Sequence, residues 1–312
     1  MGSITQLYVW QVSVLSCARY GNKLSFTSVP DIEAPGAFDD VVNDVDGVIH
    51  AASPYKYPVD DNERDLFHPA VNGTLRILEA VHASGNKRIK RVVITSSFAA
   101  VVDTSQGLRP GKVYTERDWN PMTWDEAKAA DGSAAYCASK GFAEKAAWDF
   151  VELHQPYFSI TALCPPMVYG PNAYSIESID KINTSSKVIL NLINGSSKEV
   201  PPTGFPAFAN AHDLGLAHRL ALETPGSANK RYLITTGPYS NELICDLVRA
   251  KLPDIQDKVP VGRIPQPLQD YYLVNNDRAS KELGIEWTSL EDTITAAVEN
   301  LLHIEKEQVT LK

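Results

Sequence analysis

Short apolar runs rich in β-branched residues alternate along this chain with amphipathic stretches, and this alternation constrains the fold more than any other feature. The apolar runs lie at 24–29, 46–52, 91–96 and 159–164, and the amphipathic stretches at 69–84 and 134–153. Strands that are apolar on both faces must be covered on both faces, and helices between consecutive strands supply that cover. The pattern therefore predicts an α/β fold with a doubly wound parallel sheet.

The pattern changes after residue 170. Residues 171–210 are rich in Asn, Ser, Pro and Gly and are expected to be loop-rich. A helix at 212–223, a strand at 231–235 and helices at 240–251 and 289–306 are predicted to follow. We expect one domain from residues 1–170 and about 211–240, and a smaller carboxyl-terminal lobe from about 171–210 and 241–312.

Composition and charge exclude several classes of protein. The 312 residues carry a net charge of −9 without a dense Lys/Arg run, which argues against nucleic-acid and anionic-membrane partners. Cys17, Cys137, Cys164 and Cys245 lack metal or redox spacing and are expected to be structural thiols. The apolar run at 7–17 has no basic residues before it, and its alternation favours a strand over a signal peptide. We expect a cytoplasmic protein without a membrane span or a metal.

The segment YCASK at 136–140 is the first candidate for chemistry. Tyr136 and Lys140 are four residues apart on a predicted helix, so they share one face. An ammonium beside a phenol favours the phenolate, and such a tyrosine can protonate a carbonyl oxygen as hydride reaches the carbon. Ser97 follows a predicted strand, where ligands of open α/β sheets bind. The alternative is an ordinary helix-surface pair and a helix cap.

Several longer motifs resemble those of the extended short-chain dehydrogenases/reductases, of the NAD-dependent epimerase/dehydratase superfamily. Within them the chain is most similar to fungal aldehyde and ketone reductases and to dihydroflavonol-4-reductase/cinnamoyl-CoA reductase-like enzymes. The motifs are VPDI at 29–32, HAASP at 50–54, VNGT at 71–74, RVVITSSFAAV at 91–101, WNP at 119–121, AYCASKGFAEKAAW at 135–148, CPPMVYGP at 164–171 and LGIEWTSLEDTI at 283–294.

The resemblance implies a Rossmann-like NAD(P)-binding domain, a substrate-binding lobe and a role for each catalytic residue. Ser97 would polarise the substrate oxygen, and Tyr136 would be the acid/base. Lys140 would lower the pKa of Tyr136 and hold the nicotinamide ribose, and Asn72 would support a proton relay.

The cofactor implied by the resemblance is NADPH, with NADH as the alternative. Its expected contacts are Asp31 and Ile32 at the adenine, Ala51, Ala52, Ser53 and Thr95 along the cofactor, Tyr136 and Lys140 at the ribose, and Pro166, Met167 and Val168 at the nicotinamide. The expected substrate contacts are Ser97, Phe98, Tyr169 and Phe205. A helix cap at Asp31, a rigid turn at 165–171 and ordinary core aromatics are the structural alternatives.

The glycine-rich phosphate loop of such enzymes has no counterpart in this chain. The glycines before position 50 are Gly2, Gly21, Gly36 and Gly47, and no three of them fit the spacing of that loop. Three explanations stay open: a truncated or mis-spliced product with a non-native start, a paralogue with a weakened redox role, or an unusual amino-terminal arrangement.

The leading hypothesis is an NADPH-dependent carbonyl reductase that turns a small aldehyde or ketone, such as a fungal secondary-metabolite intermediate, into an alcohol. It would act as a monomer or a homodimer. One alternative is a non-redox dehydratase or isomerase that uses the same Ser–Tyr–Lys pocket. The other is a degenerate homologue with a binding or regulatory role.

Overall fold

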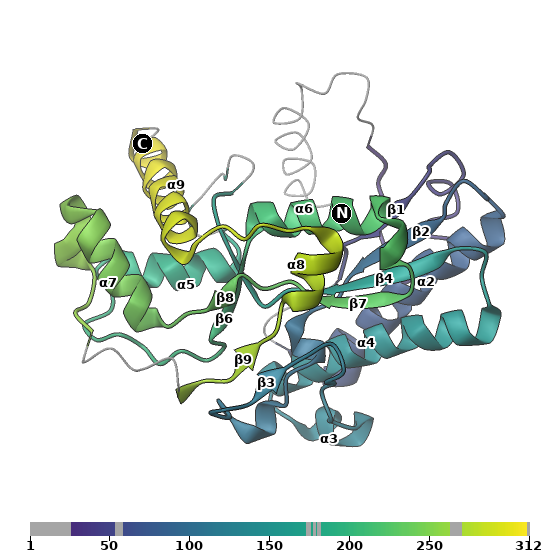
Figure 1. Cartoon of the computed structure of the whole chain (residues 1–312), viewed down its shortest axis with the longest axis horizontal. Helices are drawn as coiled ribbons and strands as arrows, with labels where there is room; N and C mark the ends of the chain where they lie inside the picture. The colour runs from purple at the N-terminus through teal and green to yellow at the C-terminus, as the bar shows by residue number, and fades with distance from the viewer. Residues whose placement is uncertain are drawn as a thin grey trace.

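Four parallel strands form the main sheet of the computed structural model, which describes residues 26–53, 59–172, 176, 179, 182–262 and 270–310 (Figure 1). In spatial order they are β1 (Val48–His50), β2 (Arg91–Thr95), β4 (Ser159–Cys164) and β7 (Lys230–Leu233). The register places Ile49 opposite Val93, and Val93 opposite Thr161. The predicted parallel sheet is thereby confirmed, with each strand within about two residues of its expected limits.

Helices cover both faces of this sheet, as Figure 1 shows. One face packs against α2 (His68–Ser84) and α4 (Gly132–His154), and the other against α6 (Ala211–Glu223) and α8 (Asp277–Leu283). Neighbouring residues of β2 divide between the faces: Val92 and Ile94 pack with α2 and α4, whereas Val93 packs with α6 and α8. This alternation explains why the central residues Val92, Val93 and Ile94 are all apolar.

A second hydrophobic core lies beside the main sheet. It packs around the sheet of β5 (Met167–Tyr169), β6 (Ala207–Asn210) and β8 (Gly237–Pro238), with α5 (Thr184–Ile193), α7 (Asn241–Lys251) and α9 (Leu290–Thr310). Shorter elements are η2 (Glu63–Phe67), η3 (Phe98–Ala100), η4 (Thr104–Gln106), β3 (Val113–Tyr114), α3 (Trp124–Ala129), η6 (Pro225–Ser227), η7 (Pro253–Lys258) and β9 (Leu273–Val274).

Residues 171–210 were expected to be loop-rich, and helix α5 is an element within them that the sequence pattern did not predict. Asn183 caps its amino end by accepting a hydrogen bond from the Ser186 backbone N–H at 3.2 Å. Ile189, Leu192 and Ile193 form its buried stripe. The polar residues of this segment flank the helix rather than replace it.

The expected strand at 24–29 is also corrected. Residues 26–29 form no strand, and the Phe26 side chain is 37% exposed. In the part of the chain that the structure describes, β2 is the only strand bonded to β1, and a strand without a neighbour leaves its backbone groups unpaired. Residues 24–25, and the run at 7–15, lie outside the described residues.

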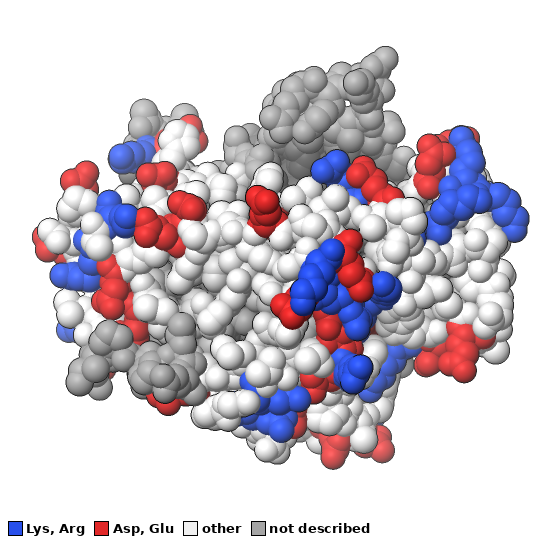
Figure 2. All heavy atoms as spheres, viewed as in Figure 1, with Lys and Arg blue, Asp and Glu red and all other residues white. Residues whose placement is uncertain are grey.

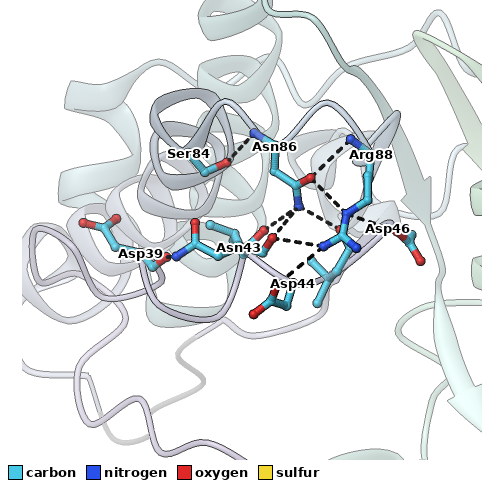
Figure 3. A network of polar contacts seen from close by, with 9 residues as sticks. Asp39, Asn43, Asp44, Asp46, Ser84, Asn86 and Arg88 are labelled. Carbon is cyan, nitrogen blue, oxygen red and sulfur yellow. Dashed lines mark hydrogen bonds and ion pairs between the residues drawn. The ribbon is translucent and has the colours of Figure 1, made fainter.

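A polar network holds the segment before β1 against the carboxyl end of α2 (Figure 3). Gly85 ends α2 in the left-handed conformation, with φ +62°. The next residue, Asn86, donates from its amide to the carbonyl oxygens of Val42 and Val45, both at 2.9 Å. Arg88 adds a hydrogen bond to the Asn43 carbonyl at 3.1 Å. These contacts fix where the chain enters β1, which ends at the candidate site.

Charged side chains of both signs are interspersed on the face drawn in Figure 2, without a continuous basic surface. Such a surface offers little attraction to a nucleic-acid backbone. None of the helices within the described ranges has an apolar stretch sufficient to span a bilayer.

Candidate active site

Helix α4 brings the predicted Tyr136 and Lys140 to one face. Asp131 starts the helix by accepting hydrogen bonds from the backbone N–H groups of Ser133 and Ala134, at 2.9 and 3.1 Å. Because four residues separate them, the Lys140 Nζ lies 6.0 Å from the centroid of the Tyr136 ring. Both side chains are half-buried. The amine is therefore placed to stabilise negative charge on the phenol.

Ser97 occupies the junction between β2 and η3. Its backbone is extended, and its hydroxyl oxygen accepts a hydrogen bond from the Ala99 N–H at 3.1 Å. The neighbouring Phe98 N–H donates to the Pro165 carbonyl at 2.8 Å, and η3 packs against α4. The ends of β2 and β4 therefore meet helix α4 at Ser97. A serine that accepts in this way keeps its own hydrogen for another acceptor.

Burial changes the acid–base behaviour of Lys140. It lowers the pKa of the amine from 10.5 to about 8, because the charged form loses hydration. A lysine with this pKa is still mainly protonated at neutral pH. It can then stabilise a phenolate while lying close to its own titration range.

Two residues near Lys140 were missed by the sequence reasoning. His50, at the end of β1, lines a small cavity together with Lys140, and Glu144 lines it from the next turn of α4. The HAASP motif and the four-residue spacing of Tyr136, Lys140 and Glu144 were the available indications.

Glu144 is the centre of a buried polar network under the site. It accepts a hydrogen bond from the Ser96 hydroxyl at 2.5 Å and another from Arg231 Nη2 at 3.1 Å. Trp148 donates from its indole nitrogen to the other carboxylate oxygen at 3.2 Å. Since Ser96 precedes Ser97, the network ties the end of β2 to α4 and β7.

The expected cofactor residues lie along the carboxyl ends of the strands. Ala51 and Ala52 are exposed just beyond β1, and Ser53 is half-buried. The Thr95 hydroxyl lies 2.7 Å from His218 Nε2. Pro166, Met167 and Val168 are half-buried; Pro166 precedes β5, and the other two are its first residues. Their contacts with a cofactor remain predictions.

The expected adenine and relay residues contact the neighbouring Glu33 and Gly73. Asp31 accepts a hydrogen bond from the Glu33 N–H at 2.9 Å, but the described residues 32–44 form turns and no helix, so the helix-cap alternative is not confirmed. The Ile32 side chain packs over Gly73, where a Cβ would come within 2.8 Å of it. Asn72 donates to the Glu33 carboxylate at 3.3 Å. The proposed relay role of Asn72 remains a prediction.

Two of the residues expected to contact the substrate, Phe98 and Tyr169, are buried in the hydrophobic core. Phe98 is 1% exposed and packs edge-on against Tyr114, with 5.5 Å between ring centroids. Tyr169 is 2% exposed, and its hydroxyl donates to that of Tyr239 at 2.9 Å. Phe205 is half-buried and packs against the hydrophobic cluster that contains Phe98. Little of their surface is available to a substrate, and substrate contact by them stays a prediction.

The described residues fit the nicotinamide end of a dinucleotide. The small, exposed Ala51 and Ala52 leave the backbone after β1 open to close approach, and Ala52 lines the same cavity as Lys140. The amino-terminal 25 residues, where a phosphate loop would lie, are outside the described part. Among the residues described, no three His, Cys, Asp or Glu side chains group as metal ligands.

Residues 9–234 match the model of the NAD dependent epimerase/dehydratase family. A Schizosaccharomyces pombe protein described as an uncharacterized oxidoreductase is 40% identical, over 87% of this chain and 80% of its own length. A ketoreductase of Aspergillus niger, azaE, is 34% identical over 92% of this chain and 85% of its own.

The fold also matches solved structures. The crystal structure of yeast methylglyoxal/isovaleraldehyde reductase complexed with NADPH has a TM-score of 0.87, with 30% sequence identity. The match covers 95% of this chain and 90% of that chain.

Proposed function

The chain belongs to the NAD dependent epimerase/dehydratase family, and we propose that it reduces the carbonyl group of a small aldehyde or ketone with NADPH. The observation that carries the proposal is the pairing of Tyr136 and Lys140 on one face of α4. Ser97, at the end of β2, packs beside that helix through η3. The ketoreductase and methylglyoxal/isovaleraldehyde reductase relatives support this assignment because their names give the same class of reaction.

Each of the three side chains has a distinct task in this reaction. Bound NADPH supplies the hydride. The Ser97 hydroxyl donates a hydrogen bond to the substrate oxygen and fixes its position. Tyr136 gives its phenolic proton to the same oxygen as negative charge develops there. The Lys140 ammonium stabilises the phenolate that remains.

Consumption of NADPH tests the proposal directly. Purified protein is incubated with NADPH and methylglyoxal, isovaleraldehyde or an aromatic ketone, and the loss of nicotinamide absorbance is followed. We expect turnover that is lost in Tyr136→Phe. Absence of turnover with every carbonyl tested, in protein shown by fluorescence to bind NADPH, would contradict the proposal.

A second candidate is dehydration or isomerisation in the same pocket. It is favoured by one sequence observation, the absence of a glycine triplet with phosphate-loop spacing before position 50. Chemistry of this kind would change a substrate that carries a hydroxyl group beside a carbonyl without net loss of NADPH. Product analysis by mass spectrometry distinguishes the two, because reduction adds two hydrogens whereas dehydration removes one water.

The remaining assignments complete the proposal. The second core, around α5, α7 and α9, is assigned to substrate binding, and the main sheet to the cofactor. We place the protein in the cytoplasm as a monomer or homodimer. Light scattering after gel filtration measures the oligomeric state.

A further inference from the structure

A cavity lies directly behind the catalytic amine. His50 from β1, Thr74 from α2, Thr95 and Ser96 at the end of β2, and Lys140 and Glu144 from α4 all line it, and Ala143 closes it. The space is suited to about one water molecule, which needs two to four polar partners to be stable.

His50 has an unsatisfied group in this region. Its side chain is 6% exposed, and Nε2 has no hydrogen-bond partner within the described part of the chain. A buried nitrogen without a hydrogen-bond partner is destabilising, and folded proteins usually satisfy such a group with protein or an ordered water. Burial and the charge of Lys140 lower the pKa of His50 to about 4. The ring is therefore neutral at physiological pH and has one acceptor nitrogen.

We propose that His50 is a positioning residue for Lys140, which it holds through one buried water. The Lys140 ammonium donates a hydrogen bond to the water, and the water donates one to the His50 Nε2. No proton is transferred in this arrangement. It stabilises the charged form of the amine and fixes its direction toward Tyr136, so it rests on the proposed role of Lys140 in reduction.

Two other polar groups that line the cavity, the Glu144 carboxylate and the Thr74 hydroxyl, are already engaged. One oxygen of Glu144 accepts from Ser96 and Arg231 Nη2, and the other lies 2.7 Å from Arg231 Nε and accepts from Trp148. The Thr74 hydroxyl donates to the Ala70 carbonyl at 2.9 Å.

The second buried imidazole at this end of the sheet is occupied as well. His218 lies 2.7 Å from the Thr95 hydroxyl through Nε2 and 2.7 Å from the Leu214 carbonyl through Nδ1. Tyr136 lies on the same helix as Lys140, and its ring is close to the Lys140 amine. His50 is thus the acceptor among these groups that lacks a partner.

The test measures the Lys140 pKa without any cofactor, by NMR of protein labelled at the lysine ¹³Cε, with Lys140→Met used for assignment. We expect His50→Leu to lower this pKa by about one unit, because the ammonium loses a hydrogen-bond acceptor. His50→Gln, which keeps an acceptor, should restore most of the shift. Ala143→Val leaves the imidazole in place but fills the cavity, and should lower the Lys140 pKa as His50→Leu does.

Phe38→Leu is the matched control, since Phe38 packs edge-on against the His50 ring at 6.1 Å. Phe38→Leu should lower the melting temperature and leave the Lys140 pKa unchanged. An unchanged or raised Lys140 pKa in His50→Leu and Ala143→Val would overturn the inference. If His50→Leu does not fold, Ala143→Val and His50→Gln decide the outcome. Because the titration needs no cofactor, a chain without reductase activity still gives a result.

Discussion

Arg231 and Glu144 form an ion pair in which the Arg231 Nε lies 2.7 Å from a carboxylate oxygen, with the two side chains 6% and 1% exposed. Arg231 also stacks on Trp119, with its guanidinium carbon 3.7 Å from the ring centroid. It donates to the Asp118 carbonyl at 2.5 Å. The pair thus joins β7, the loop before α3 and the helix that carries Tyr136 and Lys140.

Removing one partner of this pair should destabilise the fold strongly. Glu144→Leu leaves the Arg231 charge buried without a counter-ion, at a cost of about 3–5 kcal/mol in the free energy of unfolding. Urea denaturation measures the change. The double variant Glu144→Leu/Arg231→Met should lose less than the sum of the single variants, since no unpaired charge remains.

The exposed pair of Arg219 and Glu223 is the control. Its side chains are 62% and 57% exposed, so Glu223→Gln should cost less than about 1 kcal/mol. If Glu144→Leu and Glu223→Gln lowered the free energy of unfolding equally, the buried pair would not stabilise the position of α4 as described.

Tyr136→Phe should reduce turnover by about two to four orders of magnitude, because the proton donor is lost while the ring is kept. Fluorescence titration should show that NADPH affinity changes little. Tyr157→Phe is a matched removal of a hydroxyl away from the site, where Tyr157 donates to the Val81 carbonyl at 2.6 Å. Turnover within about twofold of the parent is expected for it. A comparable loss in both variants would point to a folding defect instead.

The rate of reduction should fall as pH rises through the pKa of Lys140, about 8. Below this pH the amine is charged and stabilises the Tyr136 phenolate, and above it the charge is lost. Measuring kcat/KM from pH 6 to 9.5 gives the alkaline limb. A rate that stays constant to pH 9.5 is the contrary result.

His50 should make the fold sensitive to acid. Its pKa in the folded protein is about 4, below the ordinary 6.5. Between these values the unfolded chain binds a proton that the folded chain does not, so stability falls as pH drops from about 6.5 to about 4. The contribution approaches about 1.4 kcal/mol per pH unit.

The measurement is urea unfolding at intervals from pH 7 to 4.5. His50→Gln should show a smaller loss of stability over this range than the parent chain. A slope in His50→Gln as steep as the parent's would place the titrating group elsewhere.

The sequence predicted the elements in which local pattern and tertiary burial agree. Helix α4 was expected at 134–153 and spans Gly132–His154, since its cap and its apolar face act together. β2 and β4 were predicted from continuous apolar runs for the same reason. At residues 26–29 the apolar run alone was misleading, because a strand also requires a bonded neighbour.

The site was predictable at Tyr136 and Lys140, where a four-residue spacing determines proximity on a helix. The partnership of Glu144 with Arg231 spans 87 residues, and no local pattern reveals it. His50 was likewise missed, because its unpaired nitrogen is a property of packing between β1 and α4. Burial also distinguishes Phe98, which is 1% exposed, from the half-buried Ser97 before it, which hydrophobicity alone does not do.

Dinucleotide affinity should be low for the 312-residue chain. The pyrophosphate is the most charged part of the ligand, and in Rossmann-like sites backbone N–H groups of a glycine-rich turn bind it. None of Gly2, Gly21, Gly36 and Gly47 belongs to a triplet with that spacing. A hydrogen bond to a charged group contributes roughly 1.5–3 kcal/mol. The loss of two such hydrogen bonds to the pyrophosphate therefore weakens NADPH binding by roughly 3–6 kcal/mol, or about two to four orders of magnitude in the dissociation constant.

Calorimetry with NADPH measures this affinity, and a dissociation constant in the millimolar range is expected. Micromolar binding would show that the amino-terminal segment provides phosphate contacts by another arrangement. If binding is weak, a family-like strand, glycine-rich turn, helix and strand grafted ahead of Lys23 should restore it. The matched graft with alanines in place of the glycines should not, because a Cβ at those positions blocks close approach of the phosphates. A folded graft that still fails to bind would favour the non-redox chemistry of the Ser97, Tyr136 and Lys140 pocket.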